Sequence, residues 1–369
     1  MSDRRTVVVK IGTSSITDGE GAIEIAAIEK LCAEIAAVRA EGHRVVLVTS
    51  GAIAAGLPEI GLGGGKRPSD TITLQAVATI GQSALMGVYR NAFAEHGLVA
   101  GQVLLVPLDF IVRTQYVHAG QTLVRLLELG VVPIVNENDA IADDEIRWGD
   151  NDRIAALVAN LVDADRLVLL TDTTGVLTAD PRIDADASLI EEIVEIDHQT
   201  EALAGGAGSA RGSGGMASKL TAAKIAAWSG VSSVIAHADR DGVLRDAIDG
   251  VAGVGTAVRA REARLPARKL WIAFAVVAQG SVVVDAGARA ALEERGKSLL
   301  AAGVRDVVGD FDAGSPVEVV DADGETFAKG LVRHAAKDLR AVAGQRSDDL
   351  PAGSPHVVIH ADDLVTLPR

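Results

Sequence analysis

The stretch VVVKIGTSSI, residues 7–16, begins as an apolar β-strand and ends in a lysine, a glycine and small hydroxyl residues. Similar apolar runs rich in β-branched residues recur along the chain and alternate with segments of helical periodicity. Strands are predicted at 6–11, 44–49, 99–106, 131–135, 166–171 and 231–236, and helices at 25–38, 73–95, 119–129, 151–162 and 216–229. This alternation predicts an α/β fold in which helices cover both faces of a mainly parallel sheet, a three-layer α/β/α arrangement.

The chain has 369 residues, more than one hydrophobic core usually organises. After about residue 257 the pattern changes, through a charged stretch, to short strands and turns. We therefore expect a larger α/β domain at 1–258, a linker at 259–270 and a smaller, mostly β domain at 271–369.

The charge balance argues against a nucleic-acid surface. The formal net charge is −15, and residues 261–369 alone carry 14 basic and 16 acidic side chains. Nucleic acids and anionic membranes are normally met by clustered positive charge. The apolar run after MSDRRT is too short for a signal peptide or a membrane span, and the single cysteine, Cys32, fits a buried apolar position. We expect a cytoplasmic protein without a membrane segment.

Small polar residues follow several predicted strands. Lys10 and Gly12 end the first strand, Ser50 and Gly51 follow the second, and Thr171-Asp172 ends a later one. In parallel sheets, ligands bind at the carboxyl ends of the strands, and glycine followed by hydroxyl residues lets backbone N–H groups converge on an anion. An ordinary turn with a serine N-cap would explain any one of these ends. Several of them in one sheet favour an anion site.

The segment GSGGMASK, residues 212–219, precedes an alanine-rich predicted helix. A helix N-terminus offers free N–H groups and a positive dipole end to a phosphate. Lys219 would lie in the first turn, where a lysine opposes the dipole, so a purely solvated role is less attractive. The chain contains no P-loop pattern, and we expect more than one loop to hold a phosphate.

Carboxylates and amides gather in VNENDA, residues 135–140, and WGDND, residues 148–152. Asp150 or Asn151 could simply cap the helix that follows. The remaining polar groups still favour a polar ligand. Asp139 suits an amino group, and Asn151 can donate to a carboxylate.

These motifs together resemble the glutamate 5-kinases of the amino acid kinase superfamily. The resemblance covers nearly the whole chain, and residues 271–369 resemble a PUA domain. Serines at 213 and 218, where threonine is common, are the main departures. The segments that carry the resemblance are VVVKIGTSSI, RVVLVTSGAIAAG, VVPIVNENDA, GDND, LLTDTTGVLTADPR and GSGGMASK.

The resemblance implies a role for each matching residue. Lys10 and Lys219 would contact the transferring phosphoryl group, and Asp152 would position both lysines. The implied glutamate-binding residues are Ser50, Gly51, Asn136, Asp139, Asp150 and Asn151. The implied ATP-binding residues are Lys10, Gly12, Thr171, Asp172, Ser213, Gly214, Gly215, Met216, Ala217, Ser218 and Lys219.

The implied chemistry is phosphorylation of the γ-carboxylate of L-glutamate by ATP. A carboxylate with a reference pKa of about 4.3 is already ionised at neutral pH, so no general base is required. We expect Mg²⁺ to be held mainly by ATP oxygens and water, without dedicated protein ligands. The resemblance also implies inhibition by proline and a homo-oligomer, a dimer or a tetramer. The alternatives are another kinase of the superfamily and, as a different class, an RNA-binding PUA protein.

Overall fold

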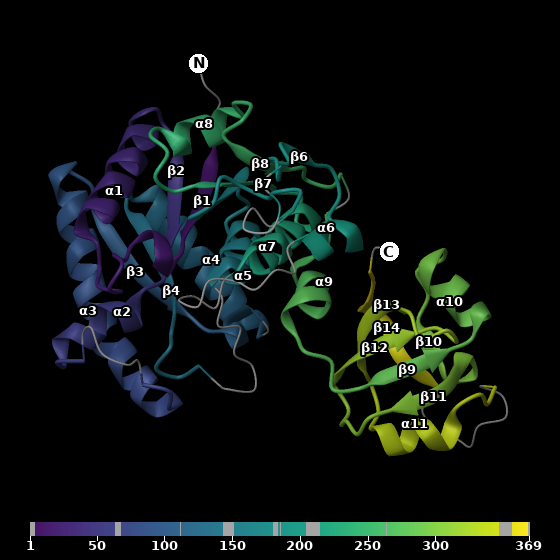
Figure 1. Ribbon diagram of the computed structural model, residues 1–369. Coiled ribbons are helices and arrows are strands. Elements are labelled where there is room, and N and C mark those ends of the chain that lie inside the picture. The colour runs from purple at the N-terminus through teal and green to yellow at the C-terminus, as the bar shows by residue number, and fades with distance from the viewer. Residues whose placement is uncertain are drawn as a thin grey trace. The chain divides into compact units, whose positions relative to one another are not determined.

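The computed structural model describes residues 4–62, 68–110, 112–142, 151–179, 184, 186–203, 215–262, 264–346 and 356–367. The chain forms two compact units, Met1–Arg264 and Leu265–Arg369 (Figure 1). The division falls within the segment that we predicted as a linker.

Among the described residues, the larger unit contains one eight-stranded sheet with the order β3-β4-β2-β1-β5-β7-β8-β6. Neighbouring strands are parallel except β7 and β8, which are antiparallel. This confirms the prediction of a mainly parallel sheet. The strands are β1 (Thr6–Ile11), β2 (Arg44–Val48), β3 (Ala100–Leu105), β4 (Val132–Glu137), β5 (Arg166–Thr171), β6 (Glu192–Ile193), β7 (Ser232–His237) and β8 (Gly255–Val258).

Helices cover both faces of this sheet, which confirms the three-layer arrangement. Figure 1 shows α1, α2 and α3 on one side and α4, α5 and α7 on the other. The first face buries alternate residues of β1, such as Val7 and Val9, against α1, α3 and α8. The helices are α1 (Ile25–Ala40), α2 (Ala52–Glu59), α3 (Thr71–Glu95), α4 (Arg113–Glu128), α5 (Asn151–Leu161), α6 (His198–Leu203), α7 (Met216–Trp228) and α8 (Val243–Asp249).

Several helices differ from the sequence prediction, and the short helices α6 and α8 were not predicted. Helix α2 was not predicted, because its small residues give little apolar periodicity. Helix α4 begins at Arg113 instead of residue 119, because its first turns are polar and contain Gly120. Of the helices in the described ranges, only α3 is long and apolar enough, by length and composition alone, to cross a membrane. Its Tyr89 and Phe93 are buried in the core of the larger unit.

Small residues let α5 and α7 approach the sheet closely. Helix α5 buries a continuous run from Ile154 to Ala159, and α7 buries four alanines together with Leu220 and Ile225. The two helices contact one another, and α5 also contacts β1. Their first turns therefore lie near the carboxyl end of β1, where Lys10 is the penultimate residue.

The smaller unit is mostly β, as predicted. Within the described residues, its six-stranded sheet has the order β10-β14-β13-β12-β9-β11, and its pairs are antiparallel except β12 with β9. Its core contains Phe311, Phe327 and Val319. The elements are α9 (Ala267–Leu270), a π-helical turn (Trp271–Ala275), β9 (Ser281–Val284), α10 (Ala286–Glu293), β10 (Leu299–Leu300), β11 (Val304–Val308), β12 (Pro316–Val320), β13 (Thr326–Val332), α11 (Ala336–Val342) and β14 (Val357–Thr366).

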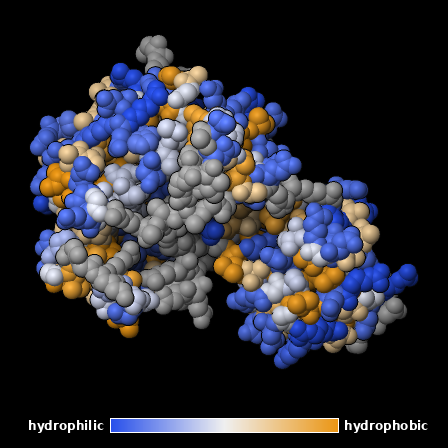
Figure 2. Space-filling view, in the orientation of Figure 1, coloured by the Kyte–Doolittle hydropathy of each residue, from blue (hydrophilic) through white to orange (hydrophobic). Residues whose placement is uncertain are grey.

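The surface seen in Figure 2 is largely hydrophilic, with apolar residues scattered over both units. Scattered apolar residues of this kind are normal on folded proteins. Cys32 is buried, as predicted, and burial raises the pKa of its thiol to about 12. The thiol is therefore held in its neutral form.

Candidate active site

A buried carboxylate joins two buried lysines at the carboxyl end of β1. Lys10 Nζ lies 2.6 Å from Asp152 Oδ1, and Lys219 Nζ lies 3.1 Å from Asp152 Oδ2. The exposed fractions of Lys10, Asp152 and Lys219 are 3%, 0% and 4%. These residues come from β1, from the first turn of α5 and from the first turn of α7. The fold thus brings together three charges that are separated by up to 209 positions in the sequence.

The two ammonium groups determine the protonation of Asp152. Burial alone would raise the pKa of this carboxyl group, but the charges of Lys10 and Lys219 and their hydrogen bonds lower it to about 2. Ser218 donates a further hydrogen bond of 3.0 Å from Oγ to Asp152 Oδ2. Asp152 is therefore ionised at neutral pH and orients both lysines.

Gly12 leaves space beside the Lys10 ammonium group. A Cβ at this position would lie 3.6 Å from Lys10 Nζ, so a larger side chain would occupy the space next to the charge. The backbone is extended at Gly12 and continues into a 3₁₀ turn at Thr13–Ser15. The absence of a side chain here suits close approach of an anion.

The first turn of α7 lies beside the lysine pair. Gly215 is the N-cap in an extended conformation, and the first turn contains no acidic residue. Thr171 and Asp172 lie at the end of β5, the strand next to β1, and Thr171 Oγ1 donates to Asp172 Oδ1 at 3.2 Å. Met216 and Ala217 begin α7. The predicted residues Ser213, Gly214 and Asp150 lie outside the described residues.

A second set of polar side chains, formed by Ser50, Asn136, Asn151 and Gln82, extends from the start of α5 toward α3. Asn151 Nδ2 donates to Ser50 Oγ and to Asn136 Oδ1, each at 2.9 Å. Asn136 Nδ2 donates to Gln82 Oε1 at 2.8 Å. We call these four side chains the amide series.

The amide series forms where β4 extends past its neighbour. The last paired residue of β2 is Val48, opposite Val135, two positions before Glu137. The N–H of Glu137 donates to Asn136 Oδ1 at 2.9 Å and to Asn151 Oδ1 at 3.2 Å. Gly51 lies beside Ser50 in the left-handed region, with φ of 101°, and caps α2. The positive φ favours glycine at this turn, and a Cβ there would also lie 2.9 Å from Ile16 Cδ1.

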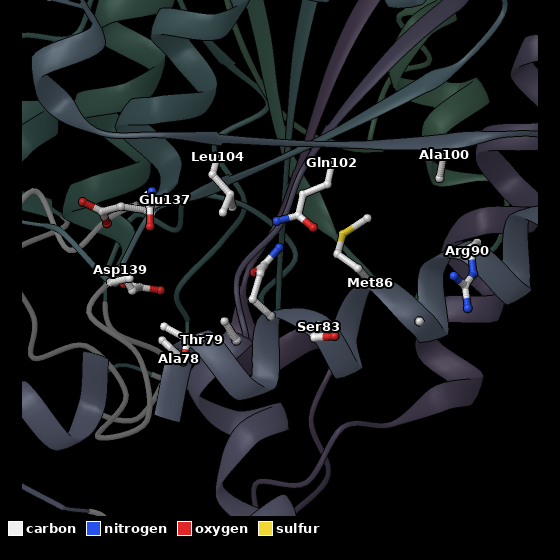
Figure 3. Close-up of a pocket in the computed structure, with 15 residues that line it drawn as sticks. Ala78, Thr79, Ser83, Met86, Arg90, Ala100, Gln102, Leu104, Glu137 and Asp139 are labelled. Atoms are coloured by element: carbon white, nitrogen blue, oxygen red, sulfur yellow. The ribbon is translucent and has the colours of Figure 1, made fainter. Parts of the chain in front are cut away.

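The amide series borders a cavity of about 560 Å³ between α3, β3 and the end of β4. In Figure 3, Glu137 and Asp139 lie on one side, Gln102 and Leu104 reach in from β3, and residues of α3 line the opposite wall. Acidic groups at one end and amide and hydroxyl groups along the wall suit a small zwitterionic ligand.

Sequence reasoning assigned roles to most of these residues but missed Gln82 and Glu137. Gln82 falls within the buried stripe of α3, which also contains Val77, Ala78, Leu85 and Tyr89. A polar residue on an otherwise apolar helical face was the available signal. Ser218 was expected to bind ATP, and the structure also places its hydroxyl group on Asp152.

Comparison with known proteins gives two family matches. Residues 5–237 match the Amino acid kinase family, and residues 280–353 match the PUA domain. Curated proteins named glutamate 5-kinase from Burkholderia multivorans and Ralstonia nicotianae are each 45% identical to this chain. The alignments span 370 and 371 residues, which is 99% and 100% of this chain and 98% of each relative. A third, from Azoarcus sp., is 45% identical over 369 residues, 99% of this chain and 98% of the relative.

Proposed function

Because the chain belongs to the amino acid kinase family and carries a PUA domain, we propose that it acts as a glutamate 5-kinase. It transfers the γ-phosphoryl group of ATP to the γ-carboxylate of L-glutamate. One carboxylate oxygen forms a bond to the γ-phosphorus, the bond from that phosphorus to the β–γ bridging oxygen breaks, and ADP leaves. The products are ADP and L-glutamyl 5-phosphate, an intermediate that leads toward proline.

The observation that carries this proposal is the contact of Lys10 and Lys219 with the two oxygens of Asp152. Both substrates are anions, and negative charge spreads over the phosphoryl oxygens during transfer. Two buried ammonium groups held in place before the reaction stabilise that charge without reorganisation. Lys10 and Lys219 contact the phosphoryl group in transit, and Asp152 positions them.

Glutamate lies between the lysine pair and the cavity. Ser50, Gly51, Asn136 and Asn151 bind glutamate through hydroxyl, amide and backbone N–H groups. Asp139, at the cavity, binds the α-ammonium group. Asp150 belongs to this set by resemblance alone. The reaction needs no base because the attacking carboxylate is already ionised at neutral pH.

ATP binds along the ends of β1 and β5 and at the start of α7. Gly12, Gly215, Met216 and Ala217 place backbone N–H groups next to the phosphates. Ser218 and Lys219 belong to the same set, and Thr171 and Asp172 contact the nucleotide. Ser213 and Gly214 belong to this set by resemblance. The open space at Gly12 and the acid-free first turn of α7 fit a triphosphate. Mg²⁺ held mainly by ATP oxygens and water would supply further positive charge.

The resemblance supports finer proposals. Proline inhibits the enzyme at a site that coincides with or overlaps the glutamate site. The chain works as a homo-oligomer, a dimer or a tetramer, in the cytoplasm. The charge balance of residues 261–369, with 14 basic and 16 acidic side chains, argues against RNA as a partner.

The direct test is ADP release from ATP and Mg²⁺ in the presence of glutamate, with hydroxylamine to trap the acyl phosphate. We expect glutamate-dependent ADP and hydroxamate, and less of both when proline is added. Aspartate, N-acetylglutamate, carbamate and UMP serve as competing acceptors. Faster phosphorylation of any of them than of glutamate would replace the proposed substrate, and a salt-sensitive tRNA complex would revive RNA binding.

A further inference from the structure

Gln82 is a buried polar residue whose two amide atoms have different surroundings. Its side chain lies on α3, it lines the cavity, and the residue is only 8% exposed. Its Oε1 accepts a hydrogen bond from Asn136. Its Nε2 is buried and has no hydrogen-bond partner among the described residues. A buried amide nitrogen without a partner is unfavourable, so its presence calls for an explanation.

The orientation of the Gln82 amide follows from a backbone group. The N–H of Glu137 can only donate, and it donates to Asn136 Oδ1. This fixes the Asn136 amide with Nδ2 on the opposite side, toward Gln82. Gln82 must then offer Oε1 to Asn136, because two NH₂ groups cannot bond to each other. The unpartnered atom is therefore a donor, and its missing partner is an acceptor.

The arrangement also indicates which substrate atom is the acceptor. The residues lining the cavity include Gln82 and Asp139, but not Lys10, Lys219 or Asp152. The reacting γ-carboxylate must approach the two lysines, so the end of glutamate that enters the cavity is the α-carbon end. This end carries an ammonium group and a carboxylate on one atom. Asp139 matches the first group, and a buried donor matches the second.

We propose that Gln82 determines specificity for the α-carboxylate of the substrate, to which its Nε2 donates a hydrogen bond. This inference rests on the proposed function. A packing role alone would not explain the residue, because a methionine of similar volume would fill the same space without a buried donor. Its contact with Asn136 uses only the oxygen atom.

Two variants test the proposal with two substrates. Gln82→Glu replaces the donor by an acceptor of nearly the same shape, and Gln82→Met removes all hydrogen bonding. The substrates are L-glutamate and its α-amide, L-isoglutamine, which keeps the reacting γ-carboxylate. Gln121→Glu is the matched control, because it makes the same change at an exposed position of α4. Circular dichroism and thermal unfolding establish that each variant is folded.

For Gln82→Met, we expect the KM for glutamate to rise about 10- to 100-fold, while kcat and the KM for ATP change little. For Gln82→Glu, we expect the ratio of kcat/KM for glutamate to that for the α-amide to fall at least about 10-fold, because the introduced carboxylate repels one substrate and accepts from the other. Gln121→Glu should keep the ratio of the unmodified enzyme.

The proposal would be overturned if Gln82→Glu keeps the wild-type ratio of kcat/KM for glutamate to that for the α-amide. An equal rise of the KM for glutamate and the KM for ATP in Gln82→Met would also overturn it. If Gln82→Glu does not fold, the glutamate and ATP KM values of Gln82→Met decide the question alone. Arg90→Met tests the alternative that Arg90, which lines the same cavity, binds the α-carboxylate. A lost preference for glutamate only in Arg90→Met would assign the α-carboxylate to that residue. Absence of glutamate-dependent ADP in the unmodified enzyme would instead refute the proposed function.

Discussion

Asp152→Asn tests whether this carboxylate holds two like charges together. The wild-type side chain is fully buried and binds Lys10 and Lys219 through separate oxygen atoms. Asparagine has almost the same shape, but it keeps only one acceptor oxygen and turns an NH₂ group toward an ammonium group. The variant therefore leaves two buried positive charges without a compensating negative charge.

The expected loss of stability is large. Removing one partner of a buried ion pair costs about 3–5 kcal/mol. Repulsion between the two ammonium groups acts in the same direction. We expect the free energy of unfolding at pH 7 to fall by about 3–5 kcal/mol, and turnover to fall on the order of 10²-fold or more.

The pH dependence gives this prediction a sign. Asparagine does not titrate, so the free energy of unfolding of the variant lacks the pH-dependent contribution that the ionised Asp152 makes in the wild type. In the wild type, the lowered pKa of Asp152 contributes stability that is lost as pH falls from 3.8 toward 2.

Urea unfolding at pH 7 and at about pH 3, followed by circular dichroism, measures both effects. Asp163→Asn is the matched control, because Asp163 pairs with Arg264 at 2.9 Å and its side chain is 85% exposed. A surface pair of this kind contributes at most about 1 kcal/mol. Equal losses for the two variants at pH 7, or a difference between the wild type and Asp152→Asn that does not shrink at the lower pH, would refute the reasoning.

Other variants test separate parts of the site. Lys10→Ala and Lys219→Ala should each lower kcat about 10²-fold or more, with a modest change in the KM for glutamate. Near-normal turnover of either variant in steady-state assays would contradict its proposed contact with the phosphoryl group. Asp139→Ala should mainly raise the glutamate KM; a normal KM with lost turnover would assign it to phosphoryl transfer instead. Gly81→Ala should separate α2 from α3 and lower the melting temperature, because its Cβ would lie 1.8 Å from the Ala52 carbonyl oxygen. Gly87→Ala, on the same helix, is the control: its Cβ would meet nothing within 4 Å, so the melting temperature should not fall.

The sequence alone was sufficient for the fold and for the edge of the sheet at which the candidate site residues gather. Apolar strands that alternate with helices predict a parallel sheet, and polar residues then gather at the carboxyl ends of the strands. Lys10, Ser50 and Thr171 were located in this way. In the structure, Lys10 is the penultimate residue of β1, Ser50 lies two residues after the end of β2, and Thr171 is the last residue of β5.

The pairing of the charges could not be worked out from spacing. Asp152 and Lys219 are 67 positions apart, and their contact depends on how closely α5 and α7 pack. Only the resemblance placed them together. Gln82 was missed for a related reason: helical periodicity identifies a buried face, but it does not show whether a polar residue on that face meets a cavity or a neighbouring amide.

Helix α5 connects the two halves of the candidate site. Its first residue, Asn151, belongs to the amide series, and its second, Asp152, binds both lysines. Adjacent residues of a helix point in directions about 100° apart, so one helix terminus can serve two neighbouring groups of atoms. A rotation or shift of α5 would disturb the proposed glutamate contacts and the lysine charges together. The buried alanines that fix α5 against β1 and α7 are therefore part of the positioning of the site, although none of them contacts a substrate.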